Sequence, residues 1–322
     1  MTETEVEAIN DQASVLMKRG IALMEEARRE AVIDALHCFD EALALRREVP
    51  ADHSPFQAYL LAACLLNRAD ALVRFNDAGP LAAALASYEE AIEVLQPLPM
   101  DEDPRYPRRL AMAFHNRGLA LQIRGLEGDA AASTAAFADA IAVLEDGHSA
   151  AIEDRDYLRA VVWLNVANLR YADPAPAAHV EAREAAARAL AHVGDREAED
   201  AQAATAGLHA RHLLCRLCAH SLSQAADEAG MPEDVHEATD AVDDGLALVR
   251  SWERRGVEGF RAVAFELFRF GARVYARYQP QFLDEFIADN MDPALSSPGY
   301  VDDPDMRLAA HEAHQLIPRD AG

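Results

Sequence analysis

Basic residues are scarce in this sequence. Its 30 Lys and Arg stand against 55 Asp and Glu, which gives a formal net charge of −25 at pH 7. Such a charge repels phosphate backbones and anionic lipid surfaces. We therefore expect no direct nucleic-acid binding and no membrane partner. Two interpretations of the charge stay open, because it can keep the protein in solution or select a partner with basic segments.

Long apolar runs are missing too, and cysteines are few. No stretch is long enough to span a bilayer, and the start, MTETEVEAINDQ, is acidic where a signal peptide is basic and then apolar. None of the four cysteines frames a loop, which is typical of a reducing compartment. These features predict a cytoplasmic protein.

Strand signals are also absent. β-branched residues do not cluster, and Ala-rich runs with apolar residues three and four apart dominate, which favours an all-α fold. Asp or Ser before Pro marks several helix starts, because the first residue can cap free N–H groups and Pro fits the first turn. We predict helix pairs at residues 3–29/31–48, 55–76/80–96, 104–125/129–145 and 154–171/175–193.

What the sequence does contain is a repeat. NRADAL at Asn67 and NRGLAL at Asn116 start 49 residues apart, and the same step leads forward to NVANLR at Asn165 and back to KRGIAL at Lys18. The segments FDEALAL, YEEAIEV, FADAIAV and AARALAH keep the same spacing. Four copies that hold register over their whole length indicate a structural repeat.

The repeat has a pattern of bulky and small positions. Each copy holds a bulky residue (Leu16, Leu65, Phe114, Trp163) and, four residues later, a small one (Gly20, Ala69, Gly118, Ala167). Three copies continue with a small residue, an aromatic residue and Ala, as in Ala35, Phe39 and Ala42, while the fourth copy lacks the aromatic residue.

This pattern resembles the tetratricopeptide repeat (TPR), a helix-turn-helix unit of about 34 residues. The longer unit here implies longer helices and loops. The resemblance covers residues 2–193 well and the rest weakly. It implies a right-handed α-solenoid of antiparallel helix pairs, a TPR-like superhelix whose first helices line a concave groove for a protein or peptide.

We predict three regions. Residues 1–258 form the TPR-like repeats, residues 259–290 form C-terminal capping helices, and residues 291–322 form an acidic, partly ordered tail. The aromatic stretch Phe260–Tyr278 closes the end of the solenoid or, alternatively, docks a second chain, which keeps a self-associating structural protein and a homo-oligomer open. The repeats are expected at about 2–49, 54–98, 104–146 and 154–193, with a degenerate fifth at 196–252.

Helical spacing predicts which residues face the groove. Positions opposite the packing face of each first helix follow from a rotation of about 100° per residue. The Asn column can donate to and accept from an extended peptide backbone, or it can bridge neighbouring helices. The predicted groove residues are Lys18, Asn67, Asp70, Arg74, Asn116, Asn165 and Asn168.

A second column consists of Arg19, Arg68 and Arg117. The fourth repeat has Val166 there, and the acid expected to face it becomes Arg188. Losing both together suggests an Arg–carboxylate pair within each repeat, and anion binding is the alternative. The predicted acidic partners are Glu41, Glu90 and Asp139.

The segment HARHLLCRLCAH, from His209 to His220, carries soft metal-ligand side chains. Residues three apart differ by about 60° around a helix, so all of them cannot reach one ion, whereas two of them and a residue from another helix can. The sequence holds no phosphate-binding loop, dinucleotide fingerprint or nucleophile elbow. We predict a binding scaffold without a cofactor; a metal- or redox-linked enzyme that uses His209, His212, Cys215 and Cys218 is the alternative.

Overall fold

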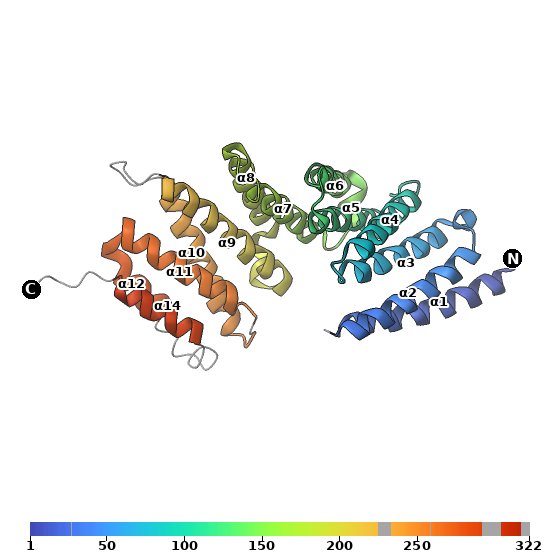
Figure 1. Cartoon of the computed structure of the whole chain (residues 1–322), viewed down its shortest axis with the longest axis horizontal. Coiled ribbons are helices and arrows are strands. Elements are labelled where there is room, and N and C mark those ends of the chain that lie inside the picture. Colours follow the sequence, from blue (N-terminus) through green and yellow to red (C-terminus); the bar gives the residue numbers. More distant parts are fainter. Residues whose placement is uncertain (27, 225–232, 258, 292–303, 317–322) are drawn as a thin grey trace, which may run out of the picture. The chain divides into compact units, whose positions relative to one another are not determined.

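The computed structural model describes residues 1–26, 28–224, 233–257, 259–291 and 304–316. These residues form α-helices, short 3-10 turns and one π-helical turn, with no strand among them (Figure 1). Within each part of the chain, from α1 to α6 and from α8 to α11, consecutive helices pack on each other, as in a solenoid. The prediction of an all-α solenoid is therefore confirmed.

The helices of the four repeats begin and end close to the predicted positions. They are α1 (Glu3–Met24), α2 (Arg29–Glu48), α3 (Pro55–Val73), α4 (Ala78–Leu95), α5 (Arg105–Arg124), α6 (Asp129–Glu145), α7 (Arg155–Tyr171) and α8 (Pro176–Val193). The remaining helices are α9 (Ala201–Gln224), α10 (Glu233–Glu253), α11 (Arg261–Tyr278), α12 (Leu283–Phe286) and α14 (Pro304–Gln315), and the π-helical turn η5 (Ile287–Met291) follows α12.

Local sequence explains several helix ends. Thr2 and Glu5 form a capping box at the start of α1, and the Ser54 side chain caps α3, in which Pro55 is the first residue. α1 ends at Met24, earlier than the predicted residue 29. The acidic side chains of Glu25 and Glu26 follow that end, where the helix dipole disfavours negative charge.

The repeat pattern has a packing cause. A Cβ atom at Gly20 would lie 2.5 Å from Cε1 of Phe39, and one at Gly118 would lie 2.6 Å from Cε1 of Phe137. Both rings are fully buried. The small residue of each first helix thus leaves room for the aromatic ring of the second helix. This recurrence makes the chain a helical repeat protein.

The chain divides into two compact units, residues 1–158 and 159–322. Helices α1 to α6 build the first, and α8 to α14 belong to the second, whose core includes Leu208, Leu246 and Leu267. The predicted division at residues 258 and 290 stays a prediction. Within the predicted tail, α14 packs on α11, whereas residues 292–303 and 317–322 lie outside the described residues. No described helix is long and apolar enough to cross a membrane.

Candidate functional site

The predicted groove amides bond mainly along their own helices. In the first unit, Nδ2 of Asn67 donates to the Ala63 carbonyl at 2.8 Å. In the second unit, Asn165 and Asn168 donate in the same way to the carbonyls four residues earlier, each at 3.0 Å. These bonds run within one helix, so they do not join one helix to another. The amide side chains themselves are half-buried or exposed.

Asp70 and Asn116 have a different role in the first unit. Oδ1 of Asp70 in α3 accepts from the Tyr88 hydroxyl in α4 at 2.5 Å and from Nδ2 of Asn116 in α5 at 3.1 Å. Burial raises the pKa of Asp70, while these two hydrogen bonds lower it. The three side chains join three consecutive helices. The alternative interpretation of the Asn column, a bridge between helices, therefore describes Asn116.

Lys18 and Arg74, the remaining predicted groove residues, are exposed. Sequence reasoning missed a neighbouring cluster of aromatic rings and guanidinium groups on the same two helices as Asn67 and Asn116. Arg109 lies 4.7 Å from the centroid of the Tyr59 ring and donates to its hydroxyl at 2.9 Å. Arg105 lies 5.5 Å from the Phe56 ring and 5.4 Å from the Tyr59 ring.

This aromatic–arginine cluster continues the predicted face by helical spacing. Phe56 and Tyr59 precede Asn67 at offsets that share one side of α3, and Arg105 and Arg109 do the same before Asn116 in α5. The signal was present in the segments PFQAY and RYPRR. The predicted column did not include it because it began two residues before the bulky position of each repeat and did not extend back to the start of the helix.

The arginine column forms ion pairs, but with other partners than predicted. Arg68 binds Asp40 at 2.6 Å and Arg117 binds Glu89 at 3.2 Å, so each Arg reaches an acid of the preceding repeat. Glu90 instead pairs with Arg47 of the preceding repeat at 2.7 Å.

The predicted pairs of Arg68 with Glu90, Arg117 with Asp139 and Arg19 with Glu41 are therefore wrong. Adjacent positions on a helix point about 100° apart, so a one-residue offset in the acid selects a different neighbour. In the observed register α2 packs between α1 and α3, and α4 packs between α3 and α5. Arg19 is exposed.

The metal-ligand types of α9 do not converge. Cys215 and Cys218 are buried, His212 is half-buried and His209 is exposed. Among the described residues, the group of potential metal ligands that includes Cys218 is completed by two acids of α10, Asp234 and Glu237, with donor atoms within 4.8 Å of one another. Sequence reasoning missed both acids.

The chemistry of this cluster fits a structural tie between helices better than a metal site. The guanidinium of Arg183 pairs with Asp234 and, at 2.8 Å, with Glu237, so it already supplies the positive charge. Burial raises the pKa of Cys218 to about 12 and also raises that of Cys215. A thiol with so high a pKa is a poor nucleophile at neutral pH.

The second unit also holds cavities. A groove of about 820 Å³ lies among α8, α9 and α10, with Leu214 and Ala241 beside the acids Asp240 and Asp244. A pocket of about 410 Å³ lies among α10, α11, α12 and η5. No sequence pattern predicted these cavities, because most of their lining residues belong to the degenerate repeat and the predicted cap, where the 49-residue register is lost.

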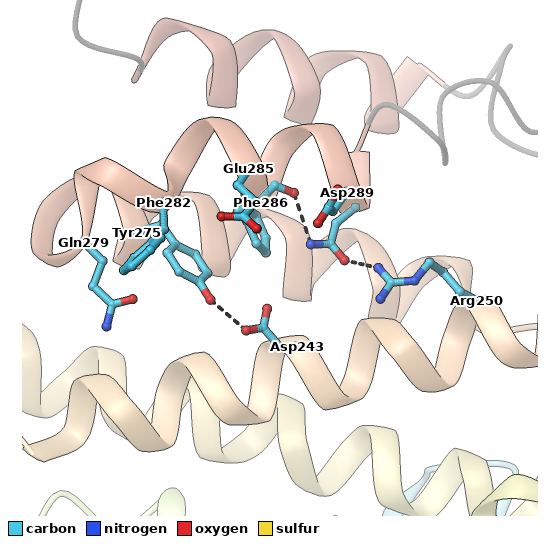
Figure 2. A pocket seen from close by; sticks show the side chains of 9 residues that line it. Asp243, Arg250, Tyr275, Gln279, Phe282, Glu285, Phe286 and Asp289 are labelled. Atoms are coloured by element: carbon cyan, nitrogen blue, oxygen red, sulfur yellow. Dashed lines mark hydrogen bonds between the residues drawn. The ribbon is translucent and has the colours of Figure 1, made fainter.

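Figure 2 shows the pocket of the second unit, which we call the α10–α12 pocket. The Tyr275 hydroxyl donates to Oδ2 of Asp243 at 2.7 Å, and Arg250 donates to Oδ1 of Asn290. Partial burial raises the pKa of Asp243, and the Tyr275 hydrogen bond opposes this shift. Glu285 and Asp289 add two further carboxylates to the lining.

No protein-family model matches the sequence, and a search of curated proteins finds no match either. Among solved structures, the crystal structure of BtubC (BKLC) from P. vanneervenii is similar, with a TM-score of 0.52 and 14% sequence identity. The match covers 91% of this chain and 96% of that chain. At this identity the similarity concerns the helical fold alone.

Proposed function

We propose that this chain is a TPR-like cytoplasmic scaffold that binds an extended segment of a protein or peptide along the first helices of its first unit. The proposal rests on one observation, the aromatic–arginine cluster of Phe56, Tyr59, Arg105 and Arg109 on α3 and α5. Phe56 is 42% exposed, and a large ring at the surface is typical of a recognition site more than of a core.

The chemistry of this face suits a peptide backbone. Arg109 makes no ion pair among the described residues and donates one hydrogen bond to the Tyr59 hydroxyl. Its other N–H groups can therefore donate to a partner's carbonyl or carboxylate. Asn67 uses one amide hydrogen within its own helix, which leaves its carbonyl oxygen as an acceptor. Aromatic and Arg side chains contribute much of the binding energy in protein interfaces.

Affinity purification from an extract of the source organism tests this proposal. The groove variant combines Phe56→Ser with Arg109→Gln. The control variant combines Leu126→Ser with Arg28→Gln, which likewise replaces one large apolar residue and one Arg at exposed positions of the first unit away from the cluster. We expect a partner that the wild type and the control retain and the groove variant loses, while all three keep the same helical melting curve.

A synthetic peptide from that partner then has to compete with the full-length partner for the wild-type chain. The single substitution Asn67→Ala should weaken binding of the peptide without unfolding α3. Identical partners in the groove variant and the control would contradict the proposal.

A further inference from the structure

The α10–α12 pocket has more negative than positive charge. Its lining includes the carboxylates of Asp243, Glu285 and Asp289 and the guanidinium of Arg250. Arg250 donates to Asn290, which is 7% exposed. Within the described part of the chain, neither Glu285 nor Asp289 forms an ion pair, and Asp243 accepts from the Tyr275 hydroxyl rather than from a cation. The pocket therefore has carboxylates that lack a counterion.

An aromatic ring at the pocket is an independent feature. Phe282 is 47% exposed and lines the cavity beside Tyr275, whose own ring stacks on the buried Phe286 with centroids 4.7 Å apart (Figure 2). A half-exposed Phe ring lacks part of the hydrophobic stabilisation that full burial in the core would give. The face of such a ring attracts a cation, which adds to the attraction of the acids.

The spacing of the carboxylates indicates the size of the cation. Among the described residues, these three acids do not form a group whose donor oxygens lie within 4.8 Å of one another, as ligands of a single metal ion must. The cavity of about 410 Å³ is also larger than a bare ion requires and is of the size of small ligand sites. An organic cation, with a charged group and an alkyl chain, fits both observations.

We propose that the α10–α12 pocket binds an organic cation, an alkylammonium or guanidinium group, with the charge toward Asp243, Glu285 and Asp289 and the alkyl part against Phe282. This site lies in the second unit and goes beyond the proposed peptide-binding face of the first unit. The cation is supplied by a free polyamine or by a Lys or Arg side chain of a partner, which share the same chemistry.

A matched pair of charge variants of the full chain provides the test. The pocket variant is Glu285→Gln/Asp289→Asn, and the control is Glu93→Gln/Asp139→Asn, which removes the same two charges from exposed positions of the first unit. The probes are spermidine and the peptides acetyl-Ala-Lys-Ala-amide and acetyl-Ala-Arg-Ala-amide, with acetyl-Ala-Gln-Ala-amide as the neutral reference. Binding is followed by ligand-detected NMR titration at low ionic strength.

We expect the wild type to bind at least one cationic probe and not the neutral peptide. The pocket variant should bind that probe about tenfold more weakly, because charge-assisted hydrogen bonds are lost. The control should change the dissociation constant by less than about twofold, as expected for distant charges in screened solvent. Phe282→Ser should weaken binding about threefold through the lost ring, whereas Leu126→Ser at an exposed position of the first unit should not.

Binding of spermidine alone would identify a free amine as the ligand, and binding of a peptide alone would identify a basic protein segment; each supports the site. The proposal is overturned if no cationic probe binds, or if the pocket variant and the control lose affinity equally, since the latter means attraction by net charge. Unchanged circular dichroism of every variant excludes unfolding as the cause of any loss.

Discussion

The two units of the chain use their polar side chains differently. In the first unit the acids and arginines at repeat positions bind each other, as Asp40 does with Arg68 and Glu89 with Arg117. In the second unit, Glu285 and Asp289 form no ion pair within the described part of the chain, and they line a cavity. These repeat positions of the first unit use their charges to hold neighbouring repeats together, whereas the pocket of the second unit leaves two carboxylates without an ion pair among the described residues.

The largest effect should come from the aromatic residue of a repeat. Phe137→Ala removes a fully buried ring from the first unit and should lower the free energy of unfolding by about 3–5 kcal/mol. Phe282→Ala, in the second unit, removes a half-exposed ring and should change it by no more than about 0.5 kcal/mol. Urea denaturation followed by circular dichroism checks both. Equal losses would show that the two rings have the same structural role.

The glycine that accommodates this ring comes next. Gly118→Ala places a methyl group 2.6 Å from the Phe137 ring and should cost about 1–3 kcal/mol. Gly79→Ala is the matched control, because its Cβ would have nothing within 4 Å, and it should be neutral or stabilise by up to about 1 kcal/mol. Thermal melting of the two variants measures the difference. Similar shifts in both would contradict the packing explanation of the repeat.

The buried carboxylate of the first unit gives a pH-dependent prediction. Burial raises the pKa of Asp70 in the folded state above its unfolded value, so the folded state binds more protons and stability falls as pH rises through that interval. Asp70→Asn should therefore gain stability relative to the wild type between about pH 4 and neutral pH. Denaturant titrations at several pH values test this, and a difference independent of pH would refute it.

Removing the hydrogen-bond donor to the Asp70 carboxylate should instead lower the free energy of unfolding. Tyr88→Phe deletes the 2.5 Å hydrogen bond and leaves the carboxylate of Asp70 poorly satisfied, at a cost of about 1–3 kcal/mol. The cost should be smaller in the Asp70→Asn background, because a neutral amide loses less. A double-mutant cycle measures this coupling, and additive effects would show that Tyr88 acts through packing alone.

The smallest effect should separate the observed ion pairs from the predicted ones. Arg68→Ala and Asp40→Ala should show a coupling of about 0.2–1 kcal/mol, since both side chains are partly exposed. Arg68→Ala and Glu90→Ala should show none, because Glu90 pairs with Arg47. A coupling of Arg68 with Glu90 in place of Asp40 would support the predicted ion pair within the repeat.

The repeat predicts the fold because the same packing requirement, a small residue against a bulky one, recurs along the chain. Gly20 with Phe39 and Gly118 with Phe137 fix which helix faces pack, so helix pairing follows from the period alone. The partner of an Arg does not follow, since Asp40 and Glu41 are both acidic and the choice depends on how one repeat stacks on the next. The α10–α12 pocket depends on the bonds of Tyr275 with Asp243 and of Arg250 with Asn290, which join the degenerate repeat to the predicted cap, and no second copy of these contacts exists to compare.

The register of the ion pairs has a consequence for how the chain can change its length. Two pairs take the Arg from one repeat and the acid from the repeat before, Arg68 with Asp40 and Arg117 with Glu89, while Arg47 and Glu90 join repeats in the opposite sense. A duplicated segment of 49 residues therefore contains the acidic partner of one inter-repeat ion pair and the Arg of another. An extra copy inserted between the second and third repeats would meet compatible surfaces at both of its ends. Gene duplication or protein engineering can lengthen this array by whole repeats without redesigning any interface.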